Sequence, residues 1–292
     1  MIEQIAAKNL LNRVKYNEWF GADYNMNLYR GCCHGCIYCD SRSECYHVED
    51  FDRVRVKAGA AEMLRRELAS KRAAGVVGIG AMSDPYNPFE RELCVTRAAL
   101  EAIAEAGFGV SLDTKSALVT RDIGLLERIR DNHSAIVKLT ITAASDALSR
   151  QLEPHVCPSS ERFSALRALA DAGIFCGVLM TPVLPFLTDS EDNVRGIIRK
   201  TAEAGGKFVF SMYGVTLRAN QRQYFYDRLD ERFPGLSARY RSTFGGSYYC
   251  PAPRHSFLKA LVQEECRTHG LLWRMPDIIR AYRGGGEQLS LF

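Results

Sequence analysis

The chain contains no run of eighteen or more apolar residues, so the sequence predicts no transmembrane helix. Its first residues, Met1-Ile2-Glu3-Gln4-Ile5, lack the basic start and the apolar core of a secretory signal. We therefore expect a cytoplasmic protein, and disulfides are rare in that compartment. No linker rich in proline, glycine and serine separates the C-terminal third from the rest.

The chain also has little excess of either charge. Lys and Arg number 38 against 34 Asp and Glu, which gives a net charge of +4. This mild basicity is compatible with a polyanionic partner such as DNA but does not require one. An apolar fraction of 47% and a charged fraction of 25% are typical of a soluble globular protein, and 292 residues can bury a substantial core.

The cysteines are unevenly distributed. Five of the ten lie between Cys32 and Cys45, whereas the other five are scattered and are expected to be small buried apolar residues. Cys32, Cys36 and Cys39 follow the spacing C-x3-C-x2-C. Thiolates so close in sequence can converge on one inorganic centre.

Two kinds of centre are compatible with this spacing. Cys36 and Cys39 form a normal zinc half-site, for which His34, Cys45 or His47 could supply the fourth ligand, but the second matched pair of a zinc knuckle is missing. An iron–sulfur cluster is commonly held by four thiolates. With only three thiolates on a [4Fe–4S] cluster, one iron stays open to bind a substrate or cofactor.

Short apolar strands alternate with amphipathic helices along most of the chain. Strands are expected at 24–30, 76–81, 109–112, 135–141, 174–180 and 207–212, and helices at 58–74, 96–107, 122–130, 160–172 and 190–204. This alternation predicts an α/β fold with a parallel sheet, and six strands are too few for a closed eight-stranded barrel. We expect a partial (β/α)6 TIM-like barrel with the cysteine loop at the carboxyl ends of its strands.

Four segments follow from this pattern. They are an N-terminal extension at 1–23, the core at 24–215, a C-terminal helical region at 216–283 and a flexible tail at 284–292. The C-terminal region contains two charged helical stretches, 220–233 and 254–269, which we expect to cap the open edge or the floor of the barrel.

The cysteine loop resembles that of the radical S-adenosylmethionine (radical SAM) superfamily, because aromatic Tyr38 precedes its last cysteine and it follows the first of six strands. The resemblance implies that Cys32, Cys36 and Cys39 hold a [4Fe–4S] cluster. The open iron would chelate the amino and carboxylate groups of S-adenosylmethionine. An electron from a reductant such as flavodoxin or ferredoxin would then yield methionine and a 5′-deoxyadenosyl radical, which takes a hydrogen atom from substrate.

Polar residues at the strand ends are the candidates for further cofactor contacts. The expected cofactor-binding residues are Tyr38, Ser83, Asp84, Lys115, Thr140 and Thr142. The resemblance places the loop after the second strand against the methionine amino group, and Lys115 could pair with the cofactor carboxylate. Each of these residues also has an explanation that involves no cofactor. The loop residues are turn formers, Lys115 could be a solvated surface lysine, and threonine is common in strands.

Three further candidates lie nearby. Glu90 could contact the cofactor or the substrate, and Thr181-Pro182-Val183-Leu184-Pro185 could shape an adenine pocket. Arg218, just beyond the sixth strand, could hold an anionic group. Cys33 and Cys45 lie outside the three-cysteine motif, and we expect neither to bind the cluster.

Three segments together resemble the spore photoproduct lyase-like branch of this superfamily: Tyr29-Arg30-Gly31-Cys32, Ser83-Asp84-Pro85-Tyr86 and Thr114-Lys115-Ser116. Those lyases reverse a thymine lesion in DNA and use a cysteine, two residues before the matching serine, as hydrogen-atom donor. Ala81 occupies that position here, and a methyl group cannot act as such a donor. The resemblance therefore favours membership of the branch over lyase activity.

The chain ends in Gln288-Leu289-Ser290-Leu291-Phe292 after three glycines. This pentapeptide resembles the motif by which proteins bind the bacterial sliding clamp, and the glycines would act as a tether. A frayed terminus or a tail docked on its own domain is the alternative. Clamp binding would bring the protein to DNA without proving a DNA substrate.

Three functions remain open at this point. The leading hypothesis is a radical SAM enzyme acting on an unidentified substrate. The second is a DNA photolesion lyase of the spore photoproduct type. The third is a zinc-stabilised, non-enzymatic binding module associated with DNA. The sequence does not identify the catalytic residues that act on substrate, the substrate itself, the electron donor or the oligomeric state.

Overall fold

A seven-stranded sheet forms the centre of the computed structural model, which describes residues 2–15 and 19–284. The strand order is β10-β9-β8-β7-β6-β3-β2, and the six strands from β3 to β10 are parallel neighbours in chain order. They are β3 (Tyr24–Met26), β6 (Val76–Ile79), β7 (Gly109–Thr114), β8 (Ala135–Thr140), β9 (Phe175–Met180) and β10 (Val209–Ser211). Short β2 (Asn12–Arg13) runs antiparallel to β3. The partial (β/α)6 barrel expected from the sequence is confirmed.

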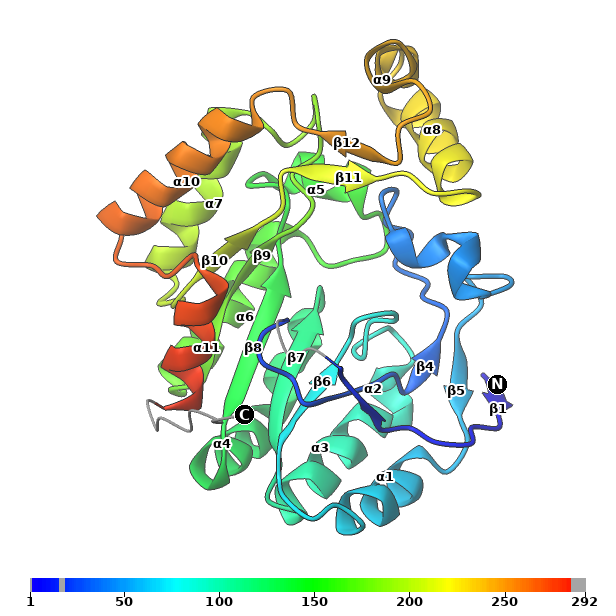
Figure 1. The fold of residues 1–292 in the computed structure, drawn as a ribbon, viewed down its shortest axis with the longest axis vertical. Helices are drawn as coiled ribbons and strands as arrows, with labels where there is room; N and C mark the ends of the chain where they lie inside the picture. The colour runs from blue at the N-terminus through cyan, green and yellow to red at the C-terminus, as the bar shows by residue number, and fades with distance from the viewer. Residues whose placement is uncertain (1, 16–18, 285–292) are drawn as a thin grey trace.

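Helices connect the parallel strands along the outer face of the sheet (Figure 1). They are α1 (Ala60–Ala69), α2 (Glu90–Leu93), α3 (Val95–Glu105), α4 (Ile123–Asn132), α5 (Asp146–Leu152), α6 (Ser159–Asp171) and α7 (Glu191–Glu203), with 3-10 turns η1 (Asp40–Arg42), η2 (Glu44–Tyr46) and η3 (Ala117–Asp122). Leu166 and Leu169 of α6 share one buried core with Val137 and Leu139 of β8. This packing uses the alternate, outward-facing residues of each strand.

Two elements differ from the expected boundaries. The helix expected at 58–74 ends at Ala69, because residues 72–74 are exposed and have no core to pack against. The extended segment 24–30 divides between two sheets: β3 joins the barrel, whereas β4 (Tyr29–Arg30) pairs antiparallel with β5 (Arg55–Lys57). Strand β1 (Glu3–Ile5) completes this second sheet by pairing with β5 in parallel.

An aromatic plug fills the amino-terminal end of the barrel. Phe20 is fully buried, with ring centroids 5.7 Å from Phe208 and 5.5 Å from Phe210. The Tyr282 hydroxyl, from α11 (Met275–Arg283), donates to the Phe20 carbonyl at 2.6 Å. Segments from the two ends of the chain therefore close the barrel floor together.

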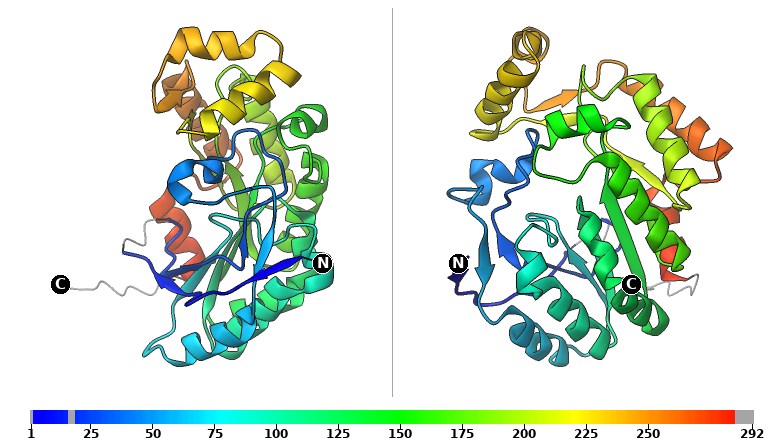
Figure 2. Two further views of the ribbon diagram at one scale, coloured as in Figure 1. Left: turned by 90° about the vertical axis from the view of Figure 1, so that its right-hand side faces the viewer. Right: turned by 180° about the vertical axis from the view of Figure 1, so that it is seen from behind.

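The C-terminal region covers two different parts of the core. Helices α8 (Gln221–Arg232) and α9 (Leu236–Phe244) lie beyond the carboxyl ends of the strands, whereas α10 (His255–Thr268) lies beside α7 (Figures 1 and 2). An antiparallel ribbon of β11 (Gly214–Thr216) and β12 (Tyr249–Pro251), which the sequence did not reveal, joins these parts. None of the helices in the described residues has the length and apolar character that a membrane span requires.

The close approach of β9 to the segment that leads into β10 leaves no room for a side chain at Gly177. A Cβ atom there would lie 2.5 Å from the ring and the carbonyl oxygen of Phe208, whereas a Cβ atom at Gly124 meets no atom within 4 Å. We expect Gly177→Ala to lower the free energy of unfolding by roughly 1–3 kcal/mol because it overpacks the core. Gly124→Ala, the matched control in α4, should leave it unchanged or raise it by up to about 1 kcal/mol. Urea denaturation measures both, and equal values for the two variants would contradict the prediction.

Candidate functional site

The cysteine loop begins where the chain leaves β4. Gly31 has φ +80°, and a Cβ atom there would lie 2.7 Å from the carbonyl oxygens of Phe51 and Arg53. The Cys32 amide donates to that Phe51 oxygen at 2.8 Å. Glycine is therefore required by both the backbone conformation and the space, and it starts the loop against a fixed neighbour.

A buried ion pair anchors the other end of the loop. The Tyr38 hydroxyl donates to the Glu153 carboxylate, which also pairs with Arg162. The Arg162 guanidinium donates to the Thr140 carbonyl oxygen at 2.8 Å, and both partners of the pair are almost completely buried. The loop is thus tied to the carboxyl end of β8 by groups that have no access to water.

Three thiols of this loop line one cavity. We call it the thiol cavity; with its solvent-filled mouth it encloses about 460 Å³. It is lined by Cys32, Cys36 and Cys39, by His34 and Ser41 of the same loop, by residues 80–84, and by Asp113, Thr114, Lys115 and Thr140. These residues follow or end β6, β7 and β8, so the cavity lies at the carboxyl ends of the strands, as expected.

The donor set fits a cluster better than a single ion. A zinc ion needs its ligands within about 2.3 Å of one point. Among residues 2–15 and 19–284, no group of three or more Cys, His, Asp or Glu side chains is arranged to hold one metal ion. The three thiols line one cavity, and a [4Fe–4S] cluster needs one thiolate for each of three separate iron atoms rather than all ligands at one point.

Asp84 links three segments around the cavity. Its Oδ1 accepts hydrogen bonds from the Tyr86 amide at 2.9 Å and the Thr114 hydroxyl at 2.7 Å. Its Oδ2 accepts from the Lys115 amide at 2.7 Å and lies 3.5 Å from Nδ1 of His34. Burial lowers the pKa of His34, but Asp84 and Cys32 raise it, and the net shift is upward. Both carboxylate oxygens of Asp84 are occupied by protein partners.

Lys115 places a positive charge beside the thiols. Burial lowers its pKa, but the negative charges of Cys36, Glu153 and Asp84 more than offset this and raise it to about 12. The side chain is therefore an ammonium at neutral pH. Burial raises the pKa of the Cys36 thiol, and the charge of Lys115 opposes that shift. Lys115 thus favours the thiolate that an iron–sulfur cluster requires.

The structure gathers most, but not all, of the predicted cofactor-binding residues. Ser83, Asp84, Lys115 and Thr140 line the thiol cavity together with the three thiols. The Ser83 hydroxyl also donates to the Gly31 carbonyl oxygen at 2.6 Å. Tyr38 and Thr142 do not line the cavity.

These two residues have other surroundings. The Tyr38 ring lies 5.8 Å from Lys115 Nζ, with its hydroxyl on Glu153. The Thr142 side chain is buried, and its carbonyl oxygen accepts from Asn193 at 2.9 Å.

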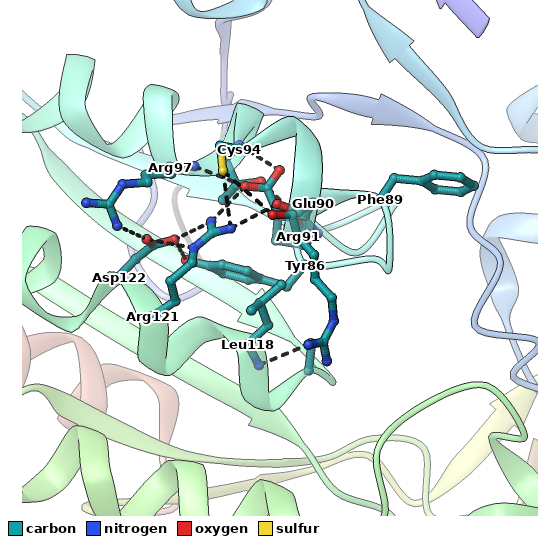
Figure 3. Close-up of polar contacts among 12 residues, drawn as sticks. Tyr86, Phe89, Glu90, Arg91, Cys94, Arg97, Leu118, Arg121 and Asp122 are labelled. Atoms are coloured by element: carbon teal, nitrogen blue, oxygen red, sulfur yellow. Dashed lines mark hydrogen bonds and ion pairs between the residues drawn. The ribbon is translucent and has the colours of Figure 1, made fainter. Parts of the chain in front are cut away.

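Glu90 lies in a separate network rather than in the cavity (Figure 3). Its carboxylate accepts from the Tyr29 hydroxyl at 2.5 Å and pairs with Arg121 at 2.8 Å. Arg121 also pairs with Asp122 at 2.7 Å, and Asp122 accepts from the Tyr86 hydroxyl at 3.0 Å. The fully buried Glu90 carboxylate therefore joins β4, the loop after β6 and η3 outside the cavity.

The remaining candidates also lie outside the cavity lining. Arg218 pairs with Asp40 at 3.2 Å and contacts the Cys45 sulfur at 3.0 Å. Burial and the neighbouring Cys32 raise the pKa of Cys33 to about 11, so it is a neutral thiol at physiological pH. The lining residues do not include 181–185 or either of these two cysteines.

Sequence reasoning missed three lining residues: His34, Ser41 and Asp113. His34 was considered only as a zinc ligand. Asp113 is the one charged residue of β7, and a charge in a buried strand could have been noticed as unusual. Its partner is on β8, so its role depends on a pairing that the sequence does not reveal.

The superfamily model for radical SAM proteins matches residues 26–215, which is more than half of the chain. The chain belongs to the radical SAM superfamily. Its cofactors are accordingly a [4Fe–4S] cluster and S-adenosylmethionine. Family membership weighs against the zinc-stabilised module.

Relatives of this chain occur in distant organisms. An uncharacterized protein of Mycobacterium tuberculosis is 30% identical over 266 residues, covering 89% of this chain and 78% of its own. An uncharacterized protein of Methanocaldococcus jannaschii is 32% identical over 236 residues, covering 80% and 84%.

Solved structures show the same fold at low identity. A spore photoproduct lyase variant with bound AdoMet and dinucleoside spore photoproduct has a TM-score of 0.65 at 16% identity, covering 93% of this chain and 82% of its own. The methyltransferase TsrM of Kitasatospora setae has a TM-score of 0.54 at 11% identity, and the match covers 82% of this chain and 51% of TsrM. The resemblance to spore photoproduct lyase is confirmed as a likeness of fold.

The buried pair of Arg162 and Glu153 should be important for stability. Arg162→Met leaves the Glu153 charge buried without a partner, which we expect to cost roughly 3–5 kcal/mol of unfolding free energy. The control is Arg199→Met, because Arg199 pairs with Glu203 in an exposed position at 3.8 Å and should contribute less than about 1 kcal/mol. Urea denaturation compares them, and similar losses would show that the buried pair does not anchor the loop.

Proposed function

We propose that this protein reductively cleaves S-adenosylmethionine and uses the resulting radical to remove a hydrogen atom from a substrate. The observation that supports this most directly is the shared thiol cavity. Three cysteines at the C-x3-C-x2-C spacing line it together with Ser83, Lys115 and Thr140, which are polar or charged residues suited to binding a zwitterionic nucleoside cofactor.

Each residue has a role in this proposal. Cys32, Cys36 and Cys39 hold the cluster, and Lys115 pairs with the cofactor carboxylate through its ammonium. Ser83 and Thr140 offer hydroxyls to the polar groups of the cofactor. When bound, the reduced cluster supplies the electron that breaks a carbon–sulfur bond of S-adenosylmethionine. An external reductant of the flavodoxin or ferredoxin type provides that electron.

The proposal is tested in anaerobically purified protein reconstituted with iron and sulfide. After reduction, wild-type protein should convert S-adenosylmethionine to 5′-deoxyadenosine and methionine, detected by chromatography. Cys36→Ala should lose the cluster absorption and this activity, because Cys36 lines the cavity. Cys45→Ala is the control, since Cys45 is exposed and lies outside the cavity, and it should keep both. Stoichiometric zinc without iron–sulfur absorption in wild-type protein would refute the proposal.

A photolesion lyase is the second candidate, and the fold likeness to spore photoproduct lyase favours it. Ala81 lines the cavity at the position where the sequence comparison expects the donor cysteine. Among the described lining residues, the only thiols are the three of the cluster motif. A lyase reaction here would therefore need a hydrogen donor from another source.

Dinucleoside spore photoproduct provides the test of lyase activity. We expect wild-type protein to cleave S-adenosylmethionine without restoring thymine efficiently, because Ala81 cannot return the hydrogen atom. Ala81→Cys should increase thymine release if the substrate site is that of a lyase. Chromatography of the dinucleoside measures both, and failure of both proteins despite active cofactor cleavage would exclude the lyase reading.

The proposed sliding-clamp motif, Gln288 to Phe292, lies outside the described residues, so the interaction stays a prediction from sequence. Deletion of residues 288–292 should abolish co-purification with a bacterial sliding clamp and leave 5′-deoxyadenosine formation unchanged. Retained clamp binding would refute the motif. DNA association through the clamp would be lost with the same deletion.

A further inference from the structure

The second half of the cysteine loop packs against residues 214–251, which comprise β11, α8, α9 and β12 and which we call the cap. Cys36, Ile37 and Tyr38 are buried in a hydrophobic cluster that is separate from the main barrel core. Every element of the cap contributes to this cluster, through Val215, Phe225, Leu229, Tyr240 and Cys250. Cys39 packs against the same cluster. Two of the three thiols of the motif are therefore supported by the cap.

Asp40 directly follows the last cysteine of the motif and links the loop to the cap, which lies beside it in Figure 1. Its Oδ1 accepts a hydrogen bond from the Thr216 hydroxyl of β11 at 2.9 Å and pairs with Nε of Arg218 at 3.2 Å. Its Oδ2 accepts from the Tyr46 hydroxyl, within the loop, at 2.9 Å. One carboxylate oxygen thus contacts the cap, and the other holds the segment that follows Cys39.

Two further side chains of the cap reach the loop. The Arg218 guanidinium lies 5.5 Å from the ring centre of Tyr46 in the loop and 5.2 Å from that of Tyr248 in the cap. Gln221 is fully buried and donates to the Tyr38 carbonyl oxygen at 3.4 Å. These contacts join groups from two segments that are distant in sequence, so they exist only while the cap is docked on the loop.

Contact between the cap and the loop has a thermodynamic consequence for metal binding. A docked cap restricts the conformations of the segment that carries Cys36 and Cys39, and this lowers the entropy cost of bringing their thiolates to iron. Coupling between two binding events is reciprocal. If the docked cap strengthens cluster binding, the bound cluster must stabilise the docked cap by the same free energy.

We propose that Asp40 is a positioning residue, which holds Cys39 in its iron-binding position by fixing the cysteine loop to the cap. Retention of the cluster and docking of the cap then depend on each other. This inference rests on the proposed function, because it takes Cys36 and Cys39 to be cluster ligands. It gives a role to Asp40 and Thr216, neither of which is among the described residues that line the thiol cavity.

Iron release from the full-length, anaerobically reconstituted protein to a ferrous chelator tests this role, with cluster absorption as the signal. Asp40→Ala should release iron about threefold to tenfold faster than wild type, because it loses hydrogen bonds to a charged group. Thr216→Val should give a smaller increase, since it removes one donor and leaves the loop and its thiols unaltered. It decides the proposal should Asp40→Ala not fold, and a wild-type rate in Thr216→Val overturns it.

Glu44→Ala is the matched control. Glu44 is an exposed acidic residue of the same segment, and it contacts the cap through its backbone amide, which donates to the Ala219 carbonyl oxygen at 3.5 Å. Truncation of its side chain keeps that contact, so this variant should release iron at the wild-type rate. Equal rates for Glu44→Ala and Asp40→Ala would overturn the proposal.

A double variant tests whether Asp40 and Thr216 act through each other. Asp40→Ala has already lost the bond from the Thr216 hydroxyl, so adding Thr216→Val should not increase the release rate further. An increase equal to the product of the two single effects would show that the residues act independently, which contradicts the proposal.

Hydrogen exchange of the cap separates the proposed coupling from local damage to the loop. Removal of iron from wild-type protein should increase amide exchange in residues 214–251 and leave β8 unchanged, and iron-loaded Asp40→Ala should show the same increase in the cap. Faster iron release with wild-type exchange in the cap overturns the proposal. Iron-loaded and iron-free wild-type proteins that exchange equally in the cap also overturn it, but leave the proposed function intact. Wild-type protein that takes up no iron refutes the proposed function itself.

Discussion

The structure depends on one constraint: three thiols of a single loop must face the same cavity. An isolated loop would not hold that geometry, because fixing each residue costs about 1–2 kcal/mol of conformational entropy. Contacts at both ends of the loop offset this entropy cost. At one end Gly31 allows close contact with the backbone of segment 51–53, and at the other Tyr38 joins the buried pair of Glu153 and Arg162.

The charges around the cavity follow from the same requirement. Thiolates in a buried site are stabilised by a nearby cation, and Lys115 provides one. Asp84 then orients the elements that carry this lysine by accepting its amide, the Thr114 hydroxyl and the Tyr86 amide. Asp84, whose two carboxylate oxygens both have protein partners, thus organises the protein around the cavity.

Several candidate residues hold the surrounding elements together and do not line the thiol cavity. Glu90 looked like a ligand contact because it follows a strand-end loop, yet its carboxylate is fully buried among Tyr29, Arg121 and the start of α3. Tyr38 is adjacent to Cys39 in sequence, but its hydroxyl is directed to Glu153. In both cases the partner lies far away along the chain, so sequence position alone could not distinguish a supporting residue from one that touches a ligand.

The sequence by itself determined the three-cysteine motif and the strand–helix alternation, because both are local patterns of spacing and periodicity. These were sufficient for the superfamily, the partial barrel and the edge of the sheet where the site lies. Only the tertiary structure decided which polar groups are free. Hydrogen-bond saturation depends on partners brought together by folding: Asp84 has partners on both oxygens, including His34 and Tyr86, whereas Lys138 is the one ion-pair partner of Asp113 among the described residues.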